Sequence, residues 1–227
     1  MSVCVFDIET VGLPWLDLDP LLREGITRGA KSGDEYRSKK EWRTLSPYAA
    51  KAVVVAVQNP ETRQGKVWYE SSVPVEGRSA DGLFELVGCP EAQMLGDFWA
   101  AVARFDRLVS FNGRSFDGPF LSVRSALHGV PPSRNLSGYR YSVSDHVDLM
   151  EVLTFQGAAS VRPTLHAACV AFGIPSPKSA EMHGYAVPQA YRDGRLAEIA
   201  EYCRRDVEAT AELFRRLEPT LLPLFRR

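Results

Sequence analysis

The architecture of this chain can be inferred from one short run near its start, Val3-Cys4-Val5-Phe6-Asp7-Ile8-Glu9. Its first four residues are all apolar, which is typical of a strand that is buried on both faces of a sheet. Successive side chains of a strand alternate between the two faces, so Asp7 and Glu9 point to the same side and Ile8 to the other. Two adjacent carboxylates repel each other unless a cation lies between them. The run therefore predicts either a metal-binding strand or a strand that ends in solvated acids.

The segments that follow set the fold class. Two β-rich segments at 52–58 and 66–71 flank a turn and predict a hairpin. The other segments expected are a helix from Pro90, a strand at 108–111, a helix that ends before Gly129, a loop at 131–145, short helices at 148–155 and 163–172, and a long helix from about 193 to 216. This order predicts an α/β protein, a mixed sheet with helices packed on its faces.

Residues 17–46 are too long for an ordinary connection between adjacent strands. Between Leu21 and Leu45 they contain seven Lys or Arg residues against four Asp or Glu residues, together with Tyr36 and Trp42. We interpret the segment as a helical insertion within a single domain that spans residues 1–227. A solvated helix is the favoured interpretation. The alternative is a guide for a nucleic-acid strand, because aromatic side chains beside basic ones suit base stacking and phosphate contact.

The composition narrows the class of protein. With 227 residues, 45% of them hydrophobic and 24% charged, the chain is expected to be one soluble globular domain. The four cysteines are scattered without a Cys-x-x-Cys pair, which argues against a disulfide framework and a structural zinc site. There is no basic leader and no apolar run near the roughly 18 residues of a membrane span, so a cytoplasmic location without membrane contact is expected.

The charge balance constrains any nucleic-acid partner. The formal net charge is −1, whereas a protein that binds DNA only by neutralising its phosphates is strongly basic. If nucleic acid is the partner, bound cations or local basic patches must supply the positive charge.

Two further acids lie in recognisable contexts. Asp117 ends the run Asn112-Gly113-Arg114-Ser115-Phe116-Asp117 just before Gly118-Pro119, where it could also serve as the N-cap of a helix. Asp206 follows Tyr202 by four residues on the long last helix, so both lie on one helical face beside its apolar stripe. A carboxylate buried there must be ligated or paired, and a salt bridge to an arginine is the alternative.

In this order, Asp-x-Glu, Asn-x-x-x-Phe-Asp and Tyr-x-x-x-Asp resemble the three motifs of the DEDD exonuclease superfamily. The tyrosine is typical of the branch that includes polymerase proofreading domains and ribonuclease D. The other branch has a histidine five residues before the last aspartate, where this chain has Glu201. Asp-Ile-Glu-Thr, the stretch from His146 to Met150 and the Tyr-Cys-x-x-Asp-Val ending are most similar to stand-alone proteins related to the exonuclease domain of family B polymerases. The resemblance implies a ribonuclease H-like fold, a mixed sheet with the first strand central.

The same resemblance implies the site. Asp7, Glu9, Asp117 and Asp206 would be the metal ligands and Tyr202 the residue that positions the attacking water. Oxygen ligands without a cluster of Cys or His favour two Mg²⁺ or Mn²⁺ ions. Such ions would also supply the positive charge that the composition lacks. A tyrosine, with an ordinary pKa near about 10, is a poor base at neutral pH, so orienting a water is its expected role.

The implied function is a 3′–5′ exonuclease that acts on single-stranded DNA, with RNA, as for ribonuclease D, as the alternative substrate. A catalytically silent nucleic-acid-binding module of the same fold and an ordinary α/β protein with unrelated surface acids are the competing interpretations. Asp148 could face the site or cap the helix that follows it. The four histidines lack the spacing of metal ligands and are expected to be structural. The sequence identifies no protein partner.

Overall fold

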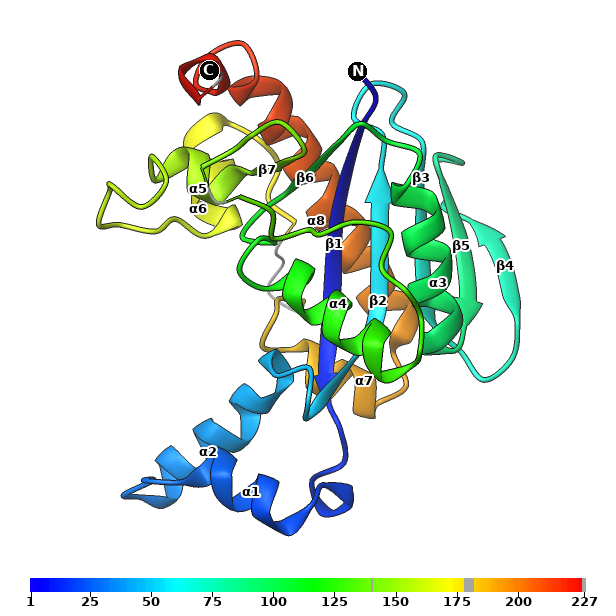
Figure 1. The fold of residues 1–227 in the computed structure, drawn as a ribbon. Helices are drawn as coiled ribbons and strands as arrows, with labels where there is room; N and C mark the ends of the chain where they lie inside the picture. The colour runs from blue at the N-terminus through cyan, green and yellow to red at the C-terminus, as the bar shows by residue number, and fades with distance from the viewer. Residues whose placement is uncertain (140, 178–181, 226–227) are drawn as a thin grey trace.

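The computed structural model describes residues 1–139, 141–177 and 182–225. These residues contain a seven-stranded mixed sheet in the order β4-β5-β3-β2-β1-β6-β7 (Figure 1). The strands are β1 (Val3–Gly12), β2 (Ala50–Gln58), β3 (Gly65–Glu70), β4 (Val75–Arg78), β5 (Phe84–Cys89), β6 (Arg107–Ser110) and β7 (His146–Asp148). The expected hairpin is confirmed, since β2 pairs antiparallel with both β1 and β3. On the other side of β1, β6 and β7 add in parallel.

Helices cover both faces of the sheet, as the expected α/β class requires (Figure 1). On one face lie α3 (Glu91–Val102) and α4 (Asp117–Leu127). On the other lie α5 (Leu149–Leu153), α6 (Leu165–Phe172), α7 (Val187–Arg192) and α8 (Leu196–Leu217). Within the described part of the chain, no helix has both the length and the apolarity needed to cross a membrane.

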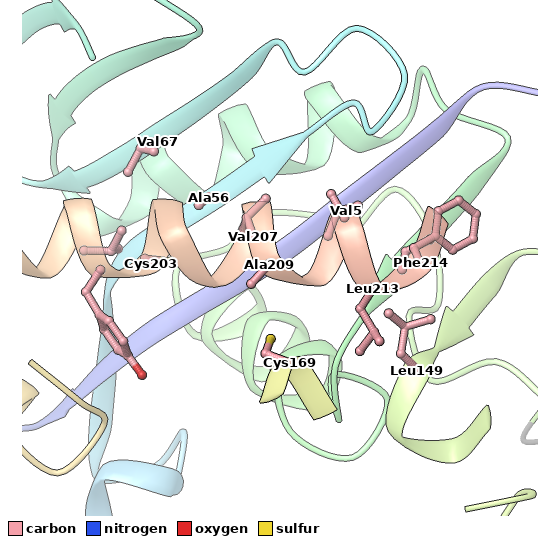
Figure 2. Packing of buried hydrophobic residues seen from close by; sticks show 14 of the residues in the cluster. Val5, Ala56, Val67, Leu149, Cys169, Cys203, Val207, Ala209, Leu213 and Phe214 are labelled. Atoms are coloured by element: carbon pink, nitrogen blue, oxygen red, sulfur yellow. The ribbon is translucent and has the colours of Figure 1, made fainter. Parts of the chain in front are cut away.

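Strand β1 separates two hydrophobic cores because its side chains alternate between the faces. Val3 and Val5 belong to the core under α8, whereas Cys4, Phe6 and Ile8 belong to the core under α3 and α4. Helix α8 lies across β1, β2 and β3, and Figure 2 shows its residues Cys203 and Val207 directed toward these strands. The alternation inferred from the first run of the sequence is therefore confirmed.

The structure also corrects several expected boundaries. Strand β1 continues three residues past Glu9 to Gly12, so the two acids lie inside the strand and do not end it. Strands β4 and β5 are not among the elements expected from the sequence, and β7 lies between the expected loop at 131–145 and the helix expected from 148. Strand β4 is an exposed edge without alternating apolar residues, and β7 has only three residues, so neither carries a detectable period. The last helix begins at Leu196, and the separate helix α7 precedes it.

The segment after β1 is a helical insertion, as expected. It contains α1 (Pro20–Thr27) and α2 (Gly33–Trp42), flanked by the short 3-10 helices η1 (Trp15–Asp17) and η2 (Arg43–Leu45). None of these elements has a buried residue, and α1 and α2 project beyond the end of β1 (Figure 1). The insertion is attached next to the acids of β1, because the Thr10 hydroxyl donates to the Thr44 carbonyl across 2.7 Å.

Candidate active site

Strand β1 presents Asp7 and Glu9 on the face covered by α8. Cys203 of α8 lies against them, with its thiol 3.6 Å from both the backbone oxygen and the Oδ2 of Asp7. Asp7, Glu9 and Cys203 each offer one atom that could bind a metal ion, and these three atoms lie within 4.8 Å of one another. The two acids of the first motif therefore face a shared space beside the last helix, as their spacing of two residues predicts.

Asp117, the first residue of α4, approaches β1 along the flank of that strand. Strand β6 pairs with β1 only over Val3–Val5, which leaves the flank of β1 open farther along. There the backbone N–H of Ile8 donates to Asp117 Oδ1 across 3.2 Å. The alternative role of Asp117 as an N-cap is wrong, because Phe116 occupies that position and no side chain caps α4. The carboxylate is instead directed at β1.

A tight turn between β6 and α4 makes this approach possible. Asn112 adopts a left-handed conformation with φ of 66°. A Cβ on the next residue, Gly113, would lie 2.4 Å from the Ser110 hydroxyl and 3.4 Å from Asp117 Oδ2. A glycine is therefore required where the backbone passes between the end of β6 and the Asp117 side chain.

The long helix contributes Tyr202 and Asp206, which are 4% and 8% exposed. Their spacing of four residues places them on one face of α8, so the Tyr202 hydroxyl lies on the same side of the helix as the Asp206 carboxylate. Burial and the charges of Asp206, Glu9 and Asp7 raise the pKa of Tyr202 well above its ordinary value. Tyr202 therefore keeps its proton at neutral pH.

Electrostatic interactions link the four acids. Burial and the charges of Asp117, Asp206 and Glu9 raise the pKa of Asp7 well above its ordinary range. Burial and the charges of Asp206 and Asp117 do the same for Glu9. The pKa of Asp117 rises to about 7, chiefly through burial. The four predicted carboxylates thus lie near enough for their charges to interact, whereas the cluster of ligand atoms within 4.8 Å among the described residues consists of Asp7, Glu9 and Cys203.

This arrangement fits a divalent cation. The charges acting on Asp7 and Glu9 are all those of neighbouring carboxylates, which oppose ionisation unless a cation is shared among them. Carboxylate oxygens are the ligands that Mg²⁺ and Mn²⁺ prefer. Cys203 was not identified from the sequence, although its spacing of three from Asp206 places both on one helical face. Burial and the nearby carboxylates raise the pKa of its thiol, which stays protonated.

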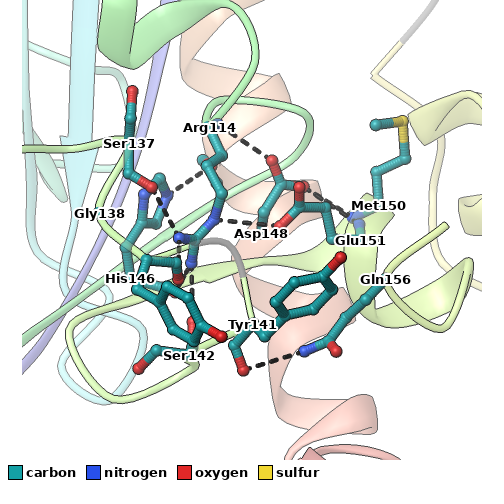
Figure 3. Close-up of polar contacts among 12 residues, drawn as sticks. Arg114, Ser137, Gly138, Tyr141, Ser142, His146, Asp148, Met150, Glu151 and Gln156 are labelled. Carbon is teal, nitrogen blue, oxygen red and sulfur yellow. Dashed lines mark hydrogen bonds and ion pairs between the residues drawn. The ribbon is translucent and has the colours of Figure 1, made fainter.

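Behind the Asp117 turn lies a polar network that the sequence analysis did not identify (Figure 3). Of the two roles expected for Asp148, the structure shows the helix cap. Its carboxylate accepts from the N–H of Met150 across 3.0 Å at the start of α5. Its carboxylate also accepts from the N–H groups of Asn112 and Arg114 across 2.9 and 3.0 Å. Asp148 therefore faces the loop behind the site and holds it.

His146 is structural, in agreement with the expectation for this residue. It is 4% exposed, its Nδ1 lies 2.5 Å from the Leu136 carbonyl oxygen, and its Nε2 lies 2.8 Å from the Ser110 hydroxyl. These partners fit the neutral tautomer with the proton on Nδ1. Burial accordingly lowers the pKa of His146 to about 4.

The sheet order and the helices on both faces define a ribonuclease H-like fold. The five strands β3-β2-β1-β6-β7 have β1 at their centre, and β5 and β4 extend the sheet beyond β3. The chain is similar to the family B DNA polymerase from the hyperthermophilic archaeon Pyrobaculum calidifontis, with a TM-score of 0.62 and 20% sequence identity. The similarity covers 96% of this chain but only 24% of the polymerase.

The chain belongs to the family described as "Predicted 3'-5' exonuclease related to the exonuclease domain of PolB", whose sequence profile matches residues 52–221. The resemblance inferred from the three motifs is thereby confirmed. The match begins after β1, so Asp7, Glu9 and the helical insertion lie outside it. No curated protein sequence matches this chain significantly.

Proposed function

We propose that this protein is a metal-dependent 3′–5′ exonuclease that hydrolyses phosphodiester bonds of single-stranded DNA by a two-metal-ion mechanism. The observation that carries the proposal is the convergence of carboxylates from β1, α4 and α8. Burial and the charges of neighbouring carboxylates raise the pKa values of Asp7, Glu9 and Asp117. Membership of a family of predicted 3′–5′ exonucleases supports the polarity and the reaction type.

In this proposal Asp7, Glu9, Asp117 and Asp206 hold two Mg²⁺ or Mn²⁺ ions. Bound there, the cations would neutralise the charge that develops on the attacking and leaving oxygens of the phosphodiester. They would also supply positive charge to a chain whose formal net charge is −1. The protein contributes a fixed set of oxygen ligands, with Asp117 held against the backbone of β1 by its bond to Ile8.

Tyr202 orients the attacking water and takes no proton from it. Its raised pKa keeps the hydroxyl protonated, and the four-residue spacing places it on the same helical face as Asp206. A protonated phenol can donate to or position a water, but it cannot act as the general base. This role agrees with the one that the resemblance implies for the residue.

The test is incubation of the purified protein with 5′-labelled DNA and RNA oligonucleotides in the presence of Mg²⁺ or Mn²⁺. A ladder that shortens from the 3′ end, with faster loss of DNA than of RNA, is the expected result. Faster loss of RNA would replace the proposed substrate with the ribonuclease D-like alternative. Binding without any cleavage under all metal conditions would favour the catalytically silent module and overturn the proposal.

A further inference from the structure

A carboxylate outside the proposed metal ligands holds the loop that presents Asp117. Asp148 is the last residue of β7, where it pairs in register with Ser110, the last residue of β6. Its side chain is 1% exposed. Asp148 therefore lies beside the point at which the chain leaves the sheet and turns toward α4.

Capping α5 does not account for a buried carboxylate at this position. The cap uses Oδ1, which accepts from Met150, and a serine or threonine could serve α5 equally well. Oδ2 accepts from the N–H of Arg114, and Oδ1 accepts in addition from the N–H of Asn112. A buried charge is costly unless several donors satisfy it, and here two of those donors belong to the loop before Asp117.

The two bonds bracket a strained turn. Asn112 has a positive φ of 66°, a conformation that costs free energy for a residue with a side chain and persists only where its surroundings impose it. From this turn, the Asn112 carbonyl accepts from Phe116 across 3.1 Å, and the Gly113 carbonyl accepts from Gly118 across 2.7 Å. The residues on both sides of Asp117 are thus bonded to the segment that Asp148 holds.

The side chain of Arg114 fixes this arrangement from behind (Figure 3). Its guanidinium donates to the carbonyls of Ser137 and Ser142 across 2.7 and 2.8 Å, and to that of His146 in β7. Its Nε lies 3.1 Å from a carboxylate oxygen of Glu151 in α5. The loop, β7 and α5 are therefore joined into one network around Asp148, and displacement of Asp148 would release the turn.

We infer that Asp148 is a positioning residue for the metal site, acting through the 112–114 turn to hold Asp117 in place relative to β1. The inference rests on the metal site proposed above. Partners of metal ligands typically contribute 10- to 100-fold to metal affinity or activity. Asp148 acts on the backbone that carries the ligand, and its charge also opposes the ionisation of Asp117 and so raises the pKa of that residue.

The experiment compares Asp148→Asn and Asp148→Ser with wild type by calorimetric titration of the full chain with Mn²⁺. In Asp148→Asn, an amide N–H₂ replaces one carboxylate oxygen and cannot accept, so the loop loses its bond at that oxygen while the remaining oxygen can still accept. In Asp148→Ser, the cap of α5 is retained and the loop bonds are lost. Both variants should bind Mn²⁺ at least about 10-fold more weakly. Amide exchange at Asn112 and Arg114 should accelerate in the metal-free variants, a readout that does not depend on activity.

Glu91→Gln is the matched control. Glu91 is also a buried carboxylate that accepts a backbone N–H, that of Ala52, and it anchors the far end of α4 through Arg124. Its substitution should lower thermal stability and leave Mn²⁺ affinity within about twofold of wild type. Equal losses of affinity in Glu91→Gln and Asp148→Asn, or wild-type affinity in Asp148→Ser, would overturn the inference. Absence of Mn²⁺ binding by wild type would overturn the proposed function as well.

Discussion

The backbone N–H of Ile8 and the carboxylate of Asp117 form a hydrogen bond of 3.2 Å that joins residues 109 positions apart in the sequence. Ile8 lies between Asp7 and Glu9, so this bond brings the second motif to the first. It forms because β6 ends early and leaves the flank of β1 without a strand partner over that stretch. A short neighbouring strand thereby creates the opening through which the third carboxylate enters the site.

Asp7→Asn should abolish cleavage and make the metal-free protein more stable at neutral pH. The substitution removes a carboxyl group whose ionisation is opposed by burial and by three neighbouring carboxylates, while keeping the shape of the side chain. Cleavage assays and thermal unfolding in EDTA measure the two effects. Glu76→Gln, on the exposed edge strand β4, is the control and should change neither. Wild-type turnover in Asp7→Asn would show that the cluster is not catalytic.

The stability of the metal-free protein should fall as pH rises from about 4 to 7. The pKa of Asp117 is about 7 in the folded state, against an ordinary value of 3.8, so the folded state binds more protons than the unfolded state within this window. Unfolding in EDTA across this pH range should show a shallower decline in Asp117→Asn than in wild type. An unchanged slope would mean that Asp117 does not titrate in this range.

Mn²⁺ should reverse that loss at neutral pH, because a cation bound by the ionised carboxylates stabilises only the folded state. At a concentration about 100 times its Kd, the expected gain is about 2.7 kcal/mol. Thermal unfolding at pH 7.5 with and without Mn²⁺ measures the gain. Asp7→Asn should lose most of it, whereas an equal gain in Asp7→Asn would place the bound ion elsewhere.

His146 should contribute a stability that rises with pH, opposite to the contribution of Asp117. Its pKa is lowered from 6.5 to about 4 by burial, so the unfolded state binds the additional proton as pH falls through this interval. Its contribution is a loss of stability below about pH 6.5, with an upper limit of about 3 kcal/mol. His146→Gln cannot take up that proton and should show a flatter acid limb in urea unfolding. An acid limb as steep as that of wild type would contradict this assignment.

The outline of the fold could be predicted because it rests on local patterns. The alternation along β1 and the four-residue spacing of Tyr202 and Asp206 each fix a face without knowledge of the rest of the chain. The network around Asp148 could not be predicted, because its bonds to Asn112 and Arg114 span 36 and 34 residues. Strand β7, which positions Asp148, is too short to leave a pattern. The same holds for Cys203, whose contact with Asp7 spans 196 residues.

Tyr202→Phe should slow turnover without weakening metal binding, because the phenol is proposed to orient the attacking water and not to ligate an ion. Positioning groups contribute on the order of 10²–10⁴-fold, and the lower end is expected where metals already activate the nucleophile. The rate below about pH 9 should keep the pH dependence of wild type, since the raised pKa of Tyr202 leaves the hydroxyl protonated throughout this range. Single-turnover rates against pH and calorimetric titration with Mn²⁺ measure both properties. Equal rates for the two proteins would reduce Tyr202 to a packing residue of α8. A titration step present in wild type and absent from Tyr202→Phe would make it a proton acceptor, against the environment that Asp206, Glu9 and Asp7 impose on it.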